Sequence, residues 1–174
     1  MSKIILKNVR LSFPSVFRKA VFDGNETKYE ATFLIDKANG AEKVKEIKDA
    51  INAMIKDDLK GAKLPPDKIC LKDGDNIDYA GYAGTFSIKA SSTKRPIALD
   101  RDKSPLTEDD NKLYAGCYVN ASLELWAQNN NYGKRINCNL LGIQFFKDGE
   151  PFADGVKGSA DDFEAFADDE EDIF

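Results

Sequence analysis

The chain has 174 residues, of which 42% are hydrophobic and 32% charged, with a formal net charge of -5. This composition is ordinary for a globular protein. There is no histidine, so the usual general base and the commonest zinc ligand are missing. No GxxxxGK(S/T) or GxGxxG loop is present to hold a nucleotide phosphate, and no apolar stretch resembles a signal peptide or membrane span. We therefore expect a cytoplasmic protein with no cofactor, no metal and no membrane partner.

Strand patterns dominate the first part of the chain. Val9, Leu11 and Phe13 alternate with Arg10 and Ser12, which predicts a half-buried strand with these three apolar residues on the core side. Similar alternation recurs along the chain, and predicts further strands at 29–35, 85–91, 118–128 and 136–146. The alternation slips by one residue around 140–142, which indicates a bulge where the strand bends.

One helix interrupts the strands. Its apolar residues keep the spacing of three and four that forms a single stripe, and these residues are Val44, Ile47, Ile51, Met54, Ile55 and Leu59. Asn39 and Gly40 before the stripe and Gly61 after it are suitable capping residues. A mainly β chain with about five strands and one inserted helix predicts an OB-fold-like five-stranded Greek-key barrel. We expect residues 1–152 to form this domain and residues 153–174 to form a flexible acidic tail.

Two polar connections, 61–84 and 92–112, are long for a compact domain, and loops of this length are usually functional or disordered. The first contains Tyr79 and Tyr82. A third connection, 129–135, is a tight hairpin that carries Tyr132. The three cysteines form no CxxC pair and are expected to be reduced thiols, two of them packed in strands; they are Cys70, Cys117 and Cys138.

The two faces of the strand at 118–128 differ in chemistry. Alternate residues from Val119 to Ala127 are all apolar and suit a core, which leaves Tyr118 and Trp126 on the polar, outward face. An outward indole exposes apolar surface at some cost, unless a loop or another copy covers it or a ligand stacks on it. The only tryptophan of the chain is therefore a candidate binding residue.

Cations lie close in sequence to these aromatic residues. Any base can stack on a flat ring, and each phosphate needs a cation, so this combination suits single-stranded nucleic acid. The residues predicted to stack on bases are Trp126, Tyr118 and Tyr132, with Tyr82 and Tyr79 as weaker candidates. The residues predicted to contact phosphates are Lys89, Lys94, Arg95, Arg101, Lys134 and Arg135. A solvated surface charge is the alternative for each cation taken alone.

The C-terminal region has the opposite charge. Residues 159–174 contain eight Asp or Glu and no Lys or Arg, so residues 1–158 carry a net charge of +3. Such a run stays solvated, and its charge density resembles that of a phosphate backbone. We expect it to compete with nucleic acid for the basic surface and, once released, to dock Ile173 and Phe174 in an apolar pocket of a partner protein. A tail that only improves solubility is the alternative.

Three stretches carry a resemblance to a known family: 7–14 (KNVRLSFP), 114–121 (YAGCYVNA) and 142–152 (GIQFFKDGEPF). In these stretches the chain resembles a family of bacteriophage single-stranded DNA-binding proteins. The resemblance implies an oligonucleotide-binding fold, sequence-tolerant binding of single-stranded DNA, and a role in phage DNA replication or recombination in the cytoplasm of the infected bacterial host. It also implies that Asp172, Ile173 and Phe174 contact replication or recombination proteins, although bacterial relatives have proline in place of Ile173.

Two other functions stay open at this point. An acidic adaptor or nucleic-acid mimic would use the tail to bind a basic protein, and a metal-dependent nuclease could be built from carboxylates alone. An exposed aromatic face would also suit a contact between copies of the chain, so a homo-oligomer is a further expectation.

Overall fold

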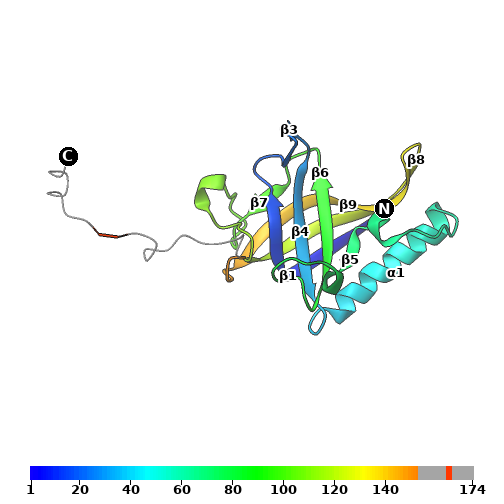
Figure 1. Cartoon of the computed structure of the whole chain (residues 1–174), viewed down its shortest axis with the longest axis horizontal. Coiled ribbons are helices and arrows are strands. Elements are labelled where there is room, and N and C mark those ends of the chain that lie inside the picture. The colour runs from blue at the N-terminus through cyan, green and yellow to red at the C-terminus, as the bar shows by residue number, and fades with distance from the viewer. Residues whose placement is uncertain (153–163, 166–174) are drawn as a thin grey trace.

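The computed structural model describes residues 1–152 and 164–165, so the predicted tail lies almost entirely outside the described residues, and its division from the domain stays a prediction. Figure 1 shows a β-barrel with one long helix. The elements in chain order are β1 (Ser2–Ser15), β2 (Val21–Phe22), β3 (Asn25–Glu26), β4 (Tyr29–Asp36), α1 (Ala41–Asp58), β5 (Leu71–Asp73), β6 (Thr85–Ser92), β7 (Ile97–Leu99), β8 (Tyr118–Asn130) and β9 (Gly133–Lys147). Short 3-10 helices lie at Pro66–Lys68, Gly74–Asn76 and Glu108–Asp110.

The barrel is a ring of β6, β4, β1, β8 and β9. Neighbouring strands pair antiparallel from β6 through β4, β1 and β8 to β9. The ring closes where β6 pairs in parallel with β9, at Ser91 and Asn139. β5 extends the sheet beside β6, and β7 extends it beside β9. The prediction of an OB-fold-like five-stranded barrel with one inserted helix is confirmed.

The inner faces of the strands form the core. On β8, Val119, Ala121, Leu123 and Leu125 are buried while the residues between them are half-buried, so the predicted sorting of its two faces is confirmed. The apolar stripe of α1 joins the same core and covers it, as expected, and its buried members are Val44, Ile47, Ile51 and Met54.

Two strands depart from regular pairing. On β9, Leu123 pairs with Leu140 and Ser122 with Gly142, so Leu141 is the extra residue of a bulge, as the slip in alternation predicted. On β1 the register shifts between Ser12 and Ser15, which the sequence did not indicate. Phe13 lies in this irregularity with a φ of 46° and is 49% exposed. The prediction that Phe13 faces the core is wrong, because the bulge turns its side chain outward.

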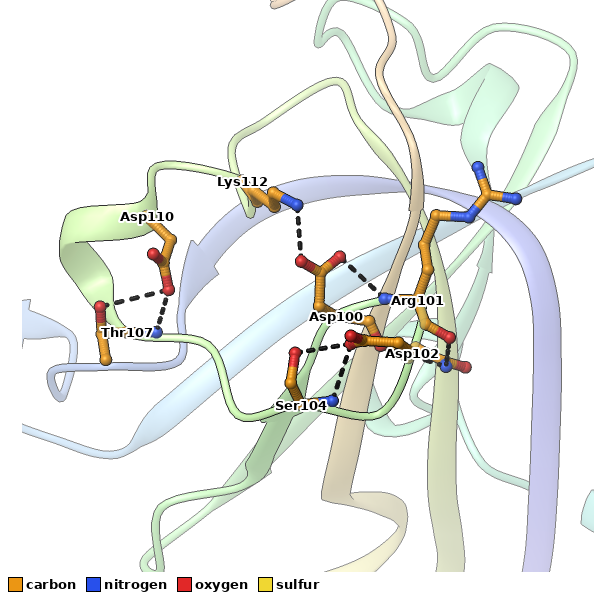
Figure 2. A network of polar contacts seen from close by, with 8 residues as sticks. Asp100, Arg101, Asp102, Ser104, Thr107, Asp110 and Lys112 are labelled. Carbon is orange, nitrogen blue, oxygen red and sulfur yellow. Dashed lines mark hydrogen bonds and ion pairs between the residues drawn. The ribbon is translucent and has the colours of Figure 1, made fainter.

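Polar contacts hold both long connections in place. In 61–84, the Lys37 ammonium lies 2.7 Å from the Asp73 carboxylate and 2.6 Å from that of Asp75, which also accepts a hydrogen bond from the Gly84 amide. In 92–112, Lys112 donates to Asp100 at 2.5 Å, and this ion pair lowers the pKa of Asp100. Figure 2 shows the surrounding network of carboxylates and loop donors. The connections are therefore folded surfaces that can form a binding site.

Candidate functional site

A groove of about 960 Å³ runs over the outer faces of β4 and β6 to the hairpin of β8 and β9. Its floor includes small polar side chains such as Thr32, Ser91 and Asn139, because barrel strands turn alternate residues outward. The folded connection 61–84 supplies further lining residues, among them Lys68 and Lys72. The aromatic and charged residues that line the groove are Phe13, Tyr79, Tyr82, Trp126, Lys28, Lys68, Lys72, Lys89, Arg135, Glu30 and Asp67.

Trp126 lies in this groove, as a half-buried residue on the outer face of β8. Its neighbour on β9 is Asn137, which also lines the groove. The indole Nε1 is buried and has no hydrogen-bond partner among the described residues. An unpaired buried donor costs about 1 to 3 kcal/mol. A water molecule or a ligand that accepts a hydrogen bond from this nitrogen would relieve the cost.

A cluster of three aromatic rings also lines the groove. The ring of Phe13 packs edge-on against Tyr79 with centroids 5.1 Å apart, and Tyr79 packs against Tyr82 at 5.4 Å. Phe13 and Tyr79 are 49% and 58% exposed, whereas Tyr82 is 3% exposed. The Tyr82 hydroxyl shares a hydrogen bond of 2.9 Å with Ser12, and burial raises the Tyr82 pKa. Tyr82 therefore supports the cluster and presents no free ring face, contrary to its predicted stacking role.

Phe13 is a candidate that its sequence pattern does not reveal. A positive φ costs a residue other than glycine about 1 to 3 kcal/mol, and such strain is concentrated at functional sites. Here the strained backbone places an aromatic ring at the edge of the groove. Pro14 was the only local signal, since a residue before proline avoids helical backbone.

Cations outnumber carboxylates along the groove. Lys89 and Arg135 had been predicted to contact phosphates, whereas Lys28, Lys68 and Lys72 had not. The Lys89 ammonium is 3.4 Å from the Glu30 carboxylate, and its side chain is 63% exposed. Exposed ion pairs of this kind contribute little, so Lys89 can exchange Glu30 for an anion. Five cations against two carboxylates give the lining of the groove a net positive charge, which favours negatively charged ligands.

Other predicted residues lie outside the groove. Tyr132 is 88% exposed at the tip of the β8–β9 hairpin, next to Lys134, which pairs with Asn129. Arg135 of the same hairpin lines the groove, whereas neither Tyr132 nor Lys134 does. Lys94 and Arg95 lie beyond the end of β6, where the Arg95 guanidinium donates to the Phe17 carbonyl at 3.0 Å.

Tyr118 and Arg101 belong to a different part of the barrel. Eight residues separate Tyr118 from Trp126 along β8, or about 26 Å at 3.3 Å per residue. The Lys147 ammonium lies 4.8 Å from the Tyr118 ring centroid, and the Gly149 backbone packs against the ring. Figure 2 shows the Arg101 guanidinium pointing away from the carboxylates of its loop, and it lies 5.6 Å from the Phe146 ring. The structure does not bring either residue to Trp126.

Neither a metal site nor a membrane span is found in the described chain. Within residues 1–152 and 164–165, no three or more Cys, Asp or Glu side chains are grouped so that they could hold a metal ion. In the same part of the chain, no helix has both the length and the apolar character needed to cross a membrane.

The three cysteines differ in burial. Cys117 and Cys138 are buried, as expected, while Cys70 is half-buried and lines the groove. Burial raises the pKa of Cys117 to about 11, so its thiol is protonated at neutral pH.

The chain matches one family of phage proteins along nearly its whole length. The sequence profile of the family described as the ssDNA-binding protein of Enterobacter phage Enc34 matches residues 2–174. A protein of Acyrthosiphon pisum secondary endosymbiont phage 1, described as putative protein p50, is 40% identical over 172 residues, which cover 93% of this chain and 92% of that protein.

Two solved structures are also similar. The single-stranded DNA-binding protein of bacteriophage Enc34, solved in complex with ssDNA, is 34% identical with a TM-score of 0.78, covering 87% of this chain and 90% of the other. The single-stranded DNA-binding protein gp2.5 of bacteriophage T7 has a TM-score of 0.55 at 13% identity, covering 91% of this chain and 99% of the other. The T7 likeness supports the fold alone.

Proposed function

The chain belongs to the phage single-stranded DNA-binding protein family described for Enterobacter phage Enc34, and from this premise we propose that it binds single-stranded DNA, without sequence preference, in the groove described above. We further propose that it acts in phage DNA replication or recombination, in the cytoplasm of the infected host, as a binding protein and not as an enzyme. The observation that carries the proposal is the meeting of exposed aromatic rings and five cations along one groove.

Each kind of side chain has a separate task in this proposal. Trp126, Tyr79 and Phe13 offer flat surfaces to bases, and stacking of this kind is worth about 1 to 3 kcal/mol per base. The five cations of the groove contact phosphates, and each phosphate neutralised on a single strand contributes about -0.7 to the log-log salt slope. Full engagement of all five therefore gives a slope of about -3.5. Neither interaction reads base edges, which accounts for binding without sequence preference.

The acidic tail is proposed to compete with DNA for the groove. A second depression shares Phe13, Tyr79 and Tyr82 with the groove and is also lined by Phe152. Phe152 packs against Gly81, where an added Cβ would lie 2.2 Å from the ring. The chain thus leaves the described domain beside the path proposed for DNA, which supports competition by the acidic run that follows. Docking of Asp172, Ile173 and Phe174 to replication or recombination proteins also stays a proposal, since these residues lie outside the described ones.

The test is a titration of labelled single strands with the full chain, followed by fluorescence anisotropy. Homopolymeric and mixed sequences of equal length should bind with similar affinity, with a salt slope of about -3.5. Addition of Mg²⁺ or a chelator should leave the strand intact. Cleavage that depends on the metal would favour the nuclease, and no binding even at low salt would favour the acidic adaptor.

A further inference from the structure

A row of four paired residues crosses the outer face of the barrel midway along β8 between Tyr118 and Trp126. Ile5 on β1 pairs with Ser122 on β8, Ser122 with Gly142 on β9, and Gly142 with Ile97 on β7. Ile5 and Ile97 are 42% and 63% exposed. Ser122 and Gly142, in the middle of the row, have little or no side chain. The surface is therefore hollowed between the side chains of Ile5 and Ile97.

The β9 bulge adds a third apolar side chain to this row. Leu141 is 38% exposed and lines a hollow of about 350 Å³ together with Ile5 and Ile97. We call this hollow the apolar dimple, defined by Ile5, Ile97, Leu141, Ser122 and Gly142. No part of the described chain covers these three large apolar side chains. Contiguous exposed apolar surface of this kind commonly marks an interaction site.

The chemistry of the dimple suits an apolar side chain better than a base. Its apolar rim is aliphatic, and no aromatic residue lines it. Lys3 and Lys7 flank Ile5 on β1 and are exposed on the same face, because Ile4 and Leu6 point into the core. An aliphatic hollow beside two ammonium groups fits a peptide that places bulky apolar side chains next to carboxylates.

We propose that the C-terminal segment of the same chain occupies the apolar dimple, with Ile173 and Phe174 in the hollow and Asp172 near Lys3 or Lys7. These two residues are the apolar pair that follows the acidic run. The carboxylates before this pair complement the charge of Lys3 and Lys7, and the apolar pair suits the aliphatic hollow. A peptide of this composition matches both features of the surface.

The intervening chain is long enough for this contact. Twenty residues separate Phe152 from Ile173. Extended, they span up to about 70 Å, and a flexible chain of this length has a typical end-to-end distance of about 25 Å. A domain of about 150 residues has a radius of gyration of about 15 Å, so the segment can reach the dimple from Phe152. Tethering raises the effective concentration to the millimolar range, so even a weak contact would be occupied.

The dimple and the DNA groove share the outer face of β8 and β9, since Trp126 and Asn139 line the groove. A segment anchored in the dimple would hold the acidic run beside the groove. An acidic run in this position would weaken DNA binding, and only this effect rests on the proposed function. Docking of the segment in the dimple does not require that the groove binds DNA.

The test observes the methyl groups of the dimple by NMR, in the full chain labelled at isoleucine and leucine methyls and without DNA. Replacement Phe174→Ala should shift the resonances of Ile5, Ile97 and Leu141, which lose the ring current of the docked phenylalanine. The matched control Phe166→Ala removes a tail phenylalanine outside the proposed contact and should leave these resonances unchanged. Unchanged dimple resonances in Phe174→Ala, or equal shifts in the control, would overturn the proposal.

Two further arms identify the occupant. Over about a tenfold dilution the wild-type resonances should stay constant, because an intramolecular contact does not depend on protein concentration. A return to the Phe174→Ala positions on dilution would mean that a second copy supplies the segment, which contradicts the proposal. In the Phe174→Ala chain, saturating single-stranded DNA should leave the resonances of the dimple unchanged, and broadening of these resonances would assign the surface to DNA and overturn the proposal.

Discussion

Replacement of Trp126 by alanine should weaken binding of single-stranded DNA while leaving the barrel folded. Trp126 is half-buried on the outer face of β8. The core residues of this strand, such as Leu125, lie on its inner face and are not changed by the replacement. The indole Nε1 gives up no hydrogen bond to a described residue. The cost to folding should therefore be small compared with the cost to binding.

The magnitude follows from the loss of one stacking surface. Stacking on an aromatic ring contributes about 1 to 3 kcal/mol per base, and about 1.4 kcal/mol corresponds to a tenfold change in affinity. The dissociation constant should rise by roughly 5-fold to 150-fold. Replacement Trp126→Phe keeps a flat ring and should retain most of the affinity, so this variant is the matched control.

Anisotropy titration with a labelled oligonucleotide measures the affinity of all three proteins under the same salt conditions. Because Trp126 is the only tryptophan of the chain, quenching of its fluorescence in the wild type reports on the same site independently. Circular dichroism and thermal unfolding establish that the alanine variant is folded. A folded alanine variant with wild-type affinity would refute the reasoning that places bases on this ring.

Three further predictions concern cations, the far end of β8 and pH. Replacement of Lys72 and Lys89 together by glutamine should make the log-log salt slope shallower by about 1.4, measured by titration at several salt concentrations; an unchanged slope would remove both from the phosphate path. Replacement Tyr118→Ala should leave single-stranded DNA affinity within about twofold of the wild type, since stacking worth about 1 kcal/mol or more would cost at least 5-fold. Because the Lys112 hydrogen bond lowers the pKa of Asp100, this contribution to stability is present above the ordinary carboxyl pKa and is lost as pH falls through the lowered value. Urea unfolding should therefore show a decrease in the free energy of unfolding below about pH 4, and a smaller decrease in Lys112→Gln.

The barrel was predictable because its strands follow local rules. Alternation along β8 separated Leu125 from Trp126, and the slip at Leu141 located the bulge, since a strand has a period of two residues wherever one face is buried. The apolar stripe of α1 was equally clear. These signals need only a short window of sequence.

The groove was only partly predictable because it is assembled from distant segments. Phe13 reaches it through a bulge that depends on pairing between β1 and β4, and Lys72 reaches it through the folded connection beside β6. Tyr82 is buried because its hydroxyl meets Ser12, seventy residues earlier in the chain. A shared outward face on one predicted strand also grouped Tyr118 with Trp126, although the length of this strand carries them to different parts of the barrel.

The most direct test of the central claim is photochemical crosslinking of the full chain to an oligonucleotide that carries 5-iodouracil, followed by mass spectrometry of the crosslinked peptides. Binding in the groove predicts crosslinks at Trp126, Tyr79 or Phe13, which are the exposed or half-buried rings that line it. Crosslinks confined to Tyr118 and Phe146, with none in the groove, would contradict the account.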